Sequence, residues 1–310
     1  MQQRRCTTCA EELLYDDKVG SYPPTPHEPG TVHVNGQASQ PEVLPPAGGY
    51  TVQRRRVSRW PTWASSPATY ILVGINCAVY LAMIAKGVSP TEPTIRQLMF
   101  WGADNADAVL IAGQWWRIVT AMFVHVGFLH LALNMWCLWN LALLAEPLMG
   151  PTGVIAVYIL TGAAGNLLST LYNWFHPMQD SGGISFAVGA GASGAVFGIA
   201  GALIVLLKST RLPVPPIELS KLRKSVIYFA AINLVLGFGI SFGASMTQSG
   251  VRIDNMAHLG GFTSGLLFAM PMVPRLGSLR QVFQSRLRVA ILMLAGILVL
   301  FGFYLSRVAG

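Results

Sequence analysis

Residues 189–201 read GAGASGAVFGIAG, and the helix packing predicted for this chain rests on this stretch. Its glycines recur every three or four residues, at Gly191, Gly194, Gly198 and Gly201. In a helix that spacing leaves one flank nearly bare, so another helix can approach its backbone closely. The surrounding window, 189–207, contains no Asp, Glu, Lys or Arg. We therefore predict a tightly packed transmembrane helix here.

The composition of the whole chain also points to lipid. Of its 310 residues 53% are hydrophobic and only 11% are charged, whereas soluble domains carry about 25% charged residues. The formal net charge is +8, but the basic residues form short clusters beside apolar runs. Such clusters indicate membrane topology, and we predict no nucleic-acid partner.

Apolar windows long enough to cross the bilayer recur along the chain. We find seven, none with a charged residue: 68–85, 128–145, 153–172, 189–207, 226–243, 255–273 and 289–306. The predicted fold class is therefore all-α, a polytopic membrane helix bundle.

Orientation follows from the Lys and Arg clusters. They lie at 54–59, 208–224 and 275–288, which is one side of the membrane if every window spans it. The positive-inside rule makes that side the cytoplasm. We expect a multi-pass protein of a bacterial plasma membrane, with the N-terminus cytoplasmic.

The predicted domain organisation has three parts. Residues 1–60 are rich in Pro and Gly and predict a flexible cytosolic tail. Residues 61–273 form a six-helix core, and residues 274–310 form a cytosolic linker and a seventh helix. In the tail, Cys6 and Cys9 have metal-ligand spacing. They are either a reduced pair or part of a zinc-binding element at 6–33, with His27 and His33 as further ligands.

Four polar residues lie near the start of alternate windows. His130 and Asn134 are in the second, Ser193 in the fourth and His258 in the sixth. Alternate helices of a serpentine chain enter from the same side, so these residues share one face of the membrane. In the orientation given above this is the outer face, and we expect an active site formed by them to open toward it. A serine becomes a nucleophile when a neighbouring base, usually histidine, takes its proton. His130 and Asn134, at i and i+4, can donate hydrogen bonds to an oxyanion.

Glycines favour contact between Ser193 and His258. In AHLGGFTSG, His258 is followed by Gly260, Gly261 and Gly265, which match the bare flank beside Ser193. In the alternative interpretation these glycines serve packing alone, and the polar residues only form hydrogen bonds between helices.

The ordered motifs resemble those of the rhomboid intramembrane serine proteases over about residues 67–273. The matching stretches are WWR at 115–117, HVGFLHLALN at 125–134, GASG at 191–194 and AHLGG at 257–261. The resemblance implies a six-helix core plus one C-terminal helix, with no cofactor.

The resemblance also implies roles for individual residues. Ser193 is the nucleophile and His258 the general base, while His130, Asn134 and the backbone N–H of Ser193 form the oxyanion hole. His125 is mainly structural, and Gly191, Gly194 and Gly261 support the site. Phe197 takes a position where the family often has a tyrosine stacked on the catalytic histidine. Glu146 and Gly150 match a structural ExxxG anchor.

Asp254, four residues before His258, has two interpretations. It either orients His258 as the third member of a triad or caps the start of the helix. The capping interpretation is favoured because carboxylates commonly cap helix N-termini.

The predicted function is hydrolysis of peptide bonds in or near transmembrane segments of membrane-protein substrates. Its partners are those substrates and the lipid bilayer. Two other classes of function remain: a catalytically silent rhomboid-like protein that binds membrane clients, and a transporter whose polar residues line a pathway. A pathway needs polar residues through the whole bilayer, whereas here they gather near one side.

Overall fold

The computed structural model describes residues 4–5, 12–13, 65–180, 183–208, 215–247, 254–275 and 279–309. The chain divides into two units, Met1–Val57 and Ser58–Gly310. In the first unit, β1 (Arg4–Arg5) pairs antiparallel with β2 (Glu12–Leu13). The predicted zinc ligands Cys6, Cys9, His27 and His33 lie outside the described residues.

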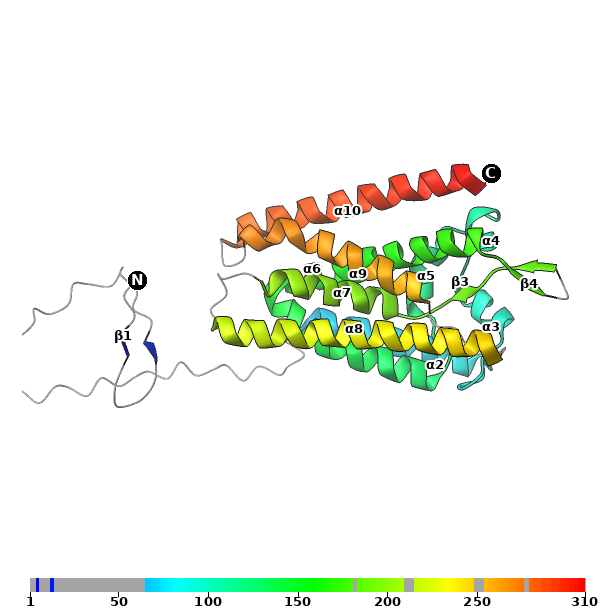
Figure 1. The fold of residues 1–310 in the computed structure, drawn as a ribbon, viewed down its shortest axis with the longest axis horizontal. Helices are drawn as coiled ribbons and strands as arrows, with labels where there is room; N and C mark the ends of the chain where they lie inside the picture. The colour runs from blue at the N-terminus through cyan, green and yellow to red at the C-terminus, as the bar shows by residue number, and fades with distance from the viewer. Residues whose placement is uncertain are drawn as a thin grey trace, which may run out of the picture. The chain divides into compact units, whose positions relative to one another are not determined.

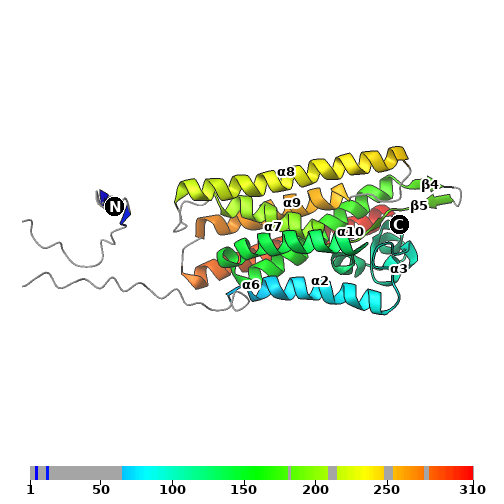
Figure 2. The same cartoon turned by 90° about the horizontal axis from the view of Figure 1, so that it is seen from below.

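The second unit is a bundle of long helices, which confirms the all-α class. They are α2 (Pro67–Ala85), α6 (Phe128–Phe175), α7 (Ser193–Leu206), α8 (Pro216–Thr247), α9 (Asn255–Ala269) and α10 (Arg280–Ala309). Figures 1 and 2 show these helices running side by side, with α7 among α6, α8 and α9. Almost every side chain of α7 is buried, as its bare glycine flank requires.

Helix α6 contains the second and third predicted windows, 128–145 and 153–172. The helical backbone is interrupted at Gly150, whose φ of 74° favours glycine. The later half of α6 lies beside the residues that precede its start. Tyr158 Oη donates to Met122 O at 3.3 Å, and Asn166 Nδ2 donates to Ile118 O at 2.8 Å. The chain therefore turns back at Gly150, which is the predicted loop between the two windows.

The structure corrects the fourth window, 189–207. Helix α7 begins only at Ser193, because Val188–Gly189 form the short strand β6. Within the part of the chain that the structure describes, four segments are long and apolar enough to span a membrane: 67–85, 128–175, 255–273 and 281–309. The six-plus-one helix count therefore stays a prediction.

Short elements fill the connection between α2 and α6. They are α3 (Ile95–Phe100), β3 (Asp104–Asn105), α4 (Ala106–Leu110), α5 (Arg117–Thr120) and the 3-10 helix η1 (Ala121–Phe123). Arg117 is buried and donates from Nη1 to Met99 O at 2.7 Å and to Ala103 O at 2.9 Å. Its guanidinium therefore ties together two backbone carbonyls of the irregular connection, of which Met99 O also accepts from the N–H of Gly102 at 3.2 Å.

Two strand pairs flank the start of α7. Strand β3 pairs antiparallel with β6, with Asp104 opposite Gly189. Strands β4 (Met178–Asp180) and β5 (Gly183–Ser185) form a second antiparallel pair. A further 3-10 helix, η2 (Met270–Arg275), follows α9. The β3–β6 pair fastens the connection after α2 to the loop that leads into Ser193.

Large apolar side chains cover the outside of the bundle. Leu129 is 70% exposed, and Leu292, Val299 and Leu300 on α10 are each 71% exposed. An exposed apolar surface on this scale is stable where lipid, not water, is the solvent. Together with the long apolar helices it identifies an integral membrane protein.

Glu146 fastens α2 to the middle of α6. Its carboxylate accepts hydrogen bonds from the backbone N–H groups of Ala68 and Thr69, both at 2.9 Å. It also accepts from Thr69 Oγ1 at 2.7 Å. Glu146 is only 3% exposed, so water could not take the place of its carboxylate as the acceptor for these donors. The glutamate acts as a cap for the first turn of α2, supplied from elsewhere in the chain.

We predict that Glu146→Ala destabilises the protein by about 3 kcal/mol, because buried donors are left without an acceptor. Thermal unfolding in detergent measures the change. Glu146→Gln keeps one acceptor oxygen and should lose less. Glu92→Ala is the control, since Glu92 is exposed. Equal melting temperatures for Glu146→Ala and Glu92→Ala would contradict the capping role.

Candidate active site

Helices α7 and α9 meet backbone to backbone through their glycines. A Cβ added to Gly261 would overlap the carbonyl oxygen of Gly194, and one added to Gly265 would overlap that of Gly198. Only glycine permits such an approach, as predicted for small-residue flanks. No other two elements of the described chain make a more extensive contact.

This contact brings the turns that carry Ser193 and His258 together. Ser193 is the half-buried first residue of α7, and His258 lies in the first turn of α9. Their chain neighbours touch, because a Cβ on Gly194 would lie 3.2 Å from Ala257 O. Ser193 and His258 are therefore on adjacent helix ends, with no helix packed between them.

The ring of His258 is held by stacking. Phe197, one turn after Ser193, lies 4.4 Å from it between ring centroids, at an interplanar angle of 13°. His258 is 6% exposed, and its Nδ1 has no hydrogen-bond partner among the described residues. The orientation of the imidazole therefore depends on the aromatic contact and on the position of α9.

His130 lies against the loop that leads into Ser193. Gly191 has a φ of +127°, and a Cβ there would be 3.0 Å from His130 Nε2. The N–H of Gly191 donates to Ala121 O at 2.9 Å. Glycine at this position meets both needs, a left-handed backbone and room for the imidazole.

Asn134 and His125 complete the polar group at the start of α6. Asn134 is 7% exposed, and its Nδ2 donates to His130 O at 2.9 Å. His125 is fully buried, and its Nδ1 lies 3.3 Å from Phe123 O. Burial, together with the neighbouring His130, lowers the pKa of His125 to about 3. His125 therefore stays neutral at physiological pH, as a structural residue can.

Asp254 caps helix α9. Its Oδ1 accepts from the backbone N–H of Ala257 at 2.9 Å, and its Oδ2 accepts from Ser169 Oγ at 2.5 Å. These contacts correspond to the capping interpretation, since both carboxylate oxygens are directed to groups other than the His258 ring.

A second buried carboxyl group, Asp104, was missed by the sequence analysis. Asp104 is 3% exposed, and its Oδ2 accepts from Thr170 Oγ1 at 2.9 Å. Its Oδ1 has no partner among the described residues. Burial raises the pKa of Asp104 to about 7, and the charge of Asp254 adds to the rise, while Thr170 and Arg117 oppose it. The only signal in the sequence was an acidic residue in the mostly apolar stretch WGADNADAVLI, where Asp107 follows three residues later.

The comparison with known families matches residues 112–275 to the rhomboid domain, which is just over half of the chain. The matched segment contains all four polar residues of the site. The chain belongs to the rhomboid family.

Curated relatives of this rhomboid come from bacteria and eukaryotes. It is 29% identical over 228 residues to "Rhomboid protease GluP" of Bacillus subtilis, covering 73% of this chain and 38% of that protein. It is 30% identical over 213 residues to "Rhomboid protease AarA" of Providencia stuartii, covering 66% and 72% respectively. "Rhomboid-like protease 2" of Toxoplasma gondii is 29% identical over 198 residues, covering 63% and 62%. The chain thus spans well under two thirds of the first relative.

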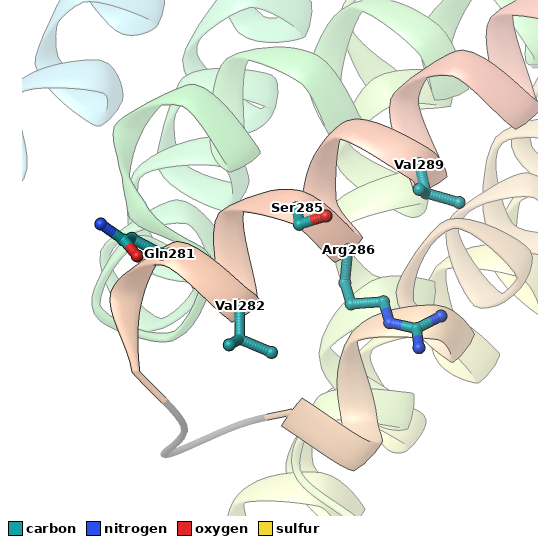
Figure 3. A pocket seen from close by; sticks show the side chains of 5 residues that line it. All are labelled: Gln281, Val282, Ser285, Arg286 and Val289. Atoms are coloured by element: carbon teal, nitrogen blue, oxygen red, sulfur yellow. The ribbon is translucent and has the colours of Figure 1, made fainter.

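A surface pocket of this rhomboid lies away from the site. Figure 3 shows its lining, which comes from the first turns of α10: Gln281, Val282, Ser285, Arg286 and Val289. In Figure 1, α10 begins at the end of the bundle opposite to β3 and the start of α7. The pocket therefore plays no part in the Ser193 and His258 arrangement. Among the described residues no three His, Cys, Asp or Glu are grouped to hold a metal ion.

We predict that Gly261→Ala disrupts the rhomboid site. The added methyl meets the backbone of Gly194, which cannot move aside as a flexible side chain would. The melting temperature should fall, and labelling of Ser193 by a fluorophosphonate should drop. Gly296→Ala is the matched control, because nothing lies within 4 Å of that position on α10. Parent-like labelling of Gly261→Ala would contradict the close packing.

We predict that Asp104 makes the stability of this rhomboid depend on pH. Its pKa is about 7 in the folded protein against 3.8 for the free carboxyl. The unfolded chain therefore ionises more readily, and the contribution of Asp104 to stability declines as pH rises from about 4 to 7. Asp104→Asn keeps an oxygen for Thr170 and should flatten this decline in melting temperature. An unchanged pH profile would contradict the shift.

Proposed function

We propose that this rhomboid is an intramembrane serine protease that hydrolyses peptide bonds in or near the transmembrane segments of other proteins. Ser193 is the nucleophile and His258 the general base. The observation that carries the proposal is the contact between their helix ends, with Gly194 against Ala257 and His258 stacked on Phe197.

The reaction proceeds by acyl transfer. Ser193 Oγ attacks the carbonyl carbon of the substrate while His258 takes the hydroxyl proton. The imidazolium then gives that proton to the departing amine, and an ester on Ser193 remains. His258 then takes a proton from water, and the resulting hydroxide attacks the ester carbonyl. The imidazolium returns that proton to Ser193 Oγ as the second product leaves. A dyad performs this sequence without a third residue, because stacking on Phe197 already orients the imidazole.

The developing oxyanion is stabilised by His130, Asn134 and the backbone N–H of Ser193. An asparagine amide has two N–H donors. Asn134 uses one of them for His130 O, and the second serves the oxyanion. Ser193 begins α7, so its N–H belongs to the unpaired donors of a helix N-terminus. His130, beside Gly191, lies next to the same loop.

Substrates reach the site from the lipid. A helical substrate shields its carbonyls by hydrogen bonding, so the segment to be cut has to unwind first. Small or helix-breaking residues near the outer end of a transmembrane segment favour this step. The orientation rests on the basic clusters, which place the N-terminus in the cytoplasm and the site near the outer face.

Ser193→Ala and His258→Ala should each lower cleavage of a transmembrane substrate by about 10³-fold or more in detergent or proteoliposomes. A fluorophosphonate should label Ser193 in the parent and fail to label it in His258→Ala, as mapped by mass spectrometry. Ser285→Ala is the control, because this exposed serine lies in the first turns of α10 (Figure 3), and α10 begins at the end of the bundle opposite to the start of α7 (Figure 1).

Two results would reject the protease assignment. Equal cleavage by the parent and by Ser193→Ala would show that the activity comes from elsewhere. A parent that binds the substrate but neither cleaves it nor reacts with the probe would favour the client-binding alternative.

A further inference from the structure

The first turn of α9 is held at its start by one carboxylate. Asp254 Oδ1 accepts from the N–H of Ala257 at 2.9 Å, and the N–H of His258 donates to Asp254 O at 3.2 Å. The two successive N–H groups that lead into His258, those of Ala257 and of His258 itself, are thus tied to Asp254. A shift of Asp254 would move His258 with it.

Asp254 is in turn anchored to α6 through Ser169. Ser169 is 1% exposed and donates from Oγ to Asp254 Oδ2 at 2.5 Å. Asn173, one turn later on α6, donates to Ser169 Oγ at 3.1 Å. Because Ser169 is buried, water does not compete for this hydrogen bond. Ser169 therefore fixes the start of α9 to a neighbouring helix.

The next residue of α6 fastens the loop before the nucleophile. Thr170 donates to Asp104 Oδ2 at 2.9 Å, and Asp104 lies opposite Gly189 in the β3–β6 pair. Strand β6 ends four residues before Ser193. Two consecutive α6 residues thus hold the two sides of the site. Ser169 holds the turn that carries His258, and Thr170 holds the chain that leads to Ser193.

We propose that Asp254, anchored by Ser169, is a positioning residue that sets the place of His258 relative to Ser193. It acts through the backbone of α9 and not as the third member of a triad. The inference rests on the protease function proposed above. Asp254 has to accept from Ala257 and stay bonded to Ser169. An asparagine should replace it, because its amide oxygen also caps helices and its amide N–H can donate to Ser169 Oγ.

Steady-state cleavage of a transmembrane substrate tests the proposal. Asp254→Ala should lower kcat by about 10- to 100-fold, because small displacements of a catalytic group cost this much, and should leave KM within about twofold. Ser169→Ala should lower kcat in the same direction by about 10-fold, since the cap remains but its anchor is lost. Asp254→Asn should keep at least about a third of parental kcat. Thr263→Ala is the control, because this exposed hydroxyl on α9 donates only within its own helix.

Four outcomes decide the matter. A parental kcat in both Asp254→Ala and Ser169→Ala would overturn the positioning role. An Asp254→Asn variant as impaired as Asp254→Ala would overturn it too, because that result is the one a triad predicts. The expected pattern supports it, with faster hydrogen exchange in the first turn of α9 in Ser169→Ala but not in Thr263→Ala. If Asp254→Ala does not fold, the Asn and Ser169 variants carry the test. Ser193-independent cleavage would instead reject the protease function, and the positioning role with it.

Discussion

The close approach of the α7 and α9 backbones is the constraint on which the rest of the structure depends. Gly194 and Gly198 present carbonyl oxygens to Gly261 and Gly265, and a methyl group at either of the latter would separate the helices. Ser193 begins one helix and His258 lies in the first turn of the other, so their separation is set by this contact. These glycines, which have no side chain, allow the helix ends that carry Ser193 and His258 to lie next to each other.

Packing of this kind is needed because lipid offers little hydrophobic driving force between helices. Buried polar contacts determine which helices pack against each other and in what position, which apolar side chains surrounded by lipid do not. Glu146 caps α2 from the middle of α6, and Asp254 ties α9 to the far end of α6. The helix α6, folded back at Gly150, thereby serves as the frame to which both neighbours are fastened.

Irregular backbone around the site is held by the same means. Non-helical segments at membrane depth persist only where the protein satisfies their polar groups. The guanidinium of Arg117 donates to the carbonyls of Met99 and Ala103, while β3 pairs with β6 ahead of Ser193. Gly191 then leaves room for His130 beside the chain that enters α7. The loop that leads into Ser193 is thus held in place by the connection between α2 and α6 as well as by the helices.

By itself the sequence determined the helical class and the break between the windows 128–145 and 153–172. It could do so because a membrane span is a contiguous, uncharged run whose length and periodicity are local properties. The placing of Ser193, His258, His130 and Asn134 near one membrane face stays a prediction. The start of α7 was placed too early, since glycine and alanine in 189–192 are apolar in a strand and in a helix alike. Only the tertiary structure decided that Ser169 meets Asp254 and Thr170 meets Asp104. These partners are 85 and 66 residues apart, and no local pattern records a hydrogen bond that forms only when distant helices pack.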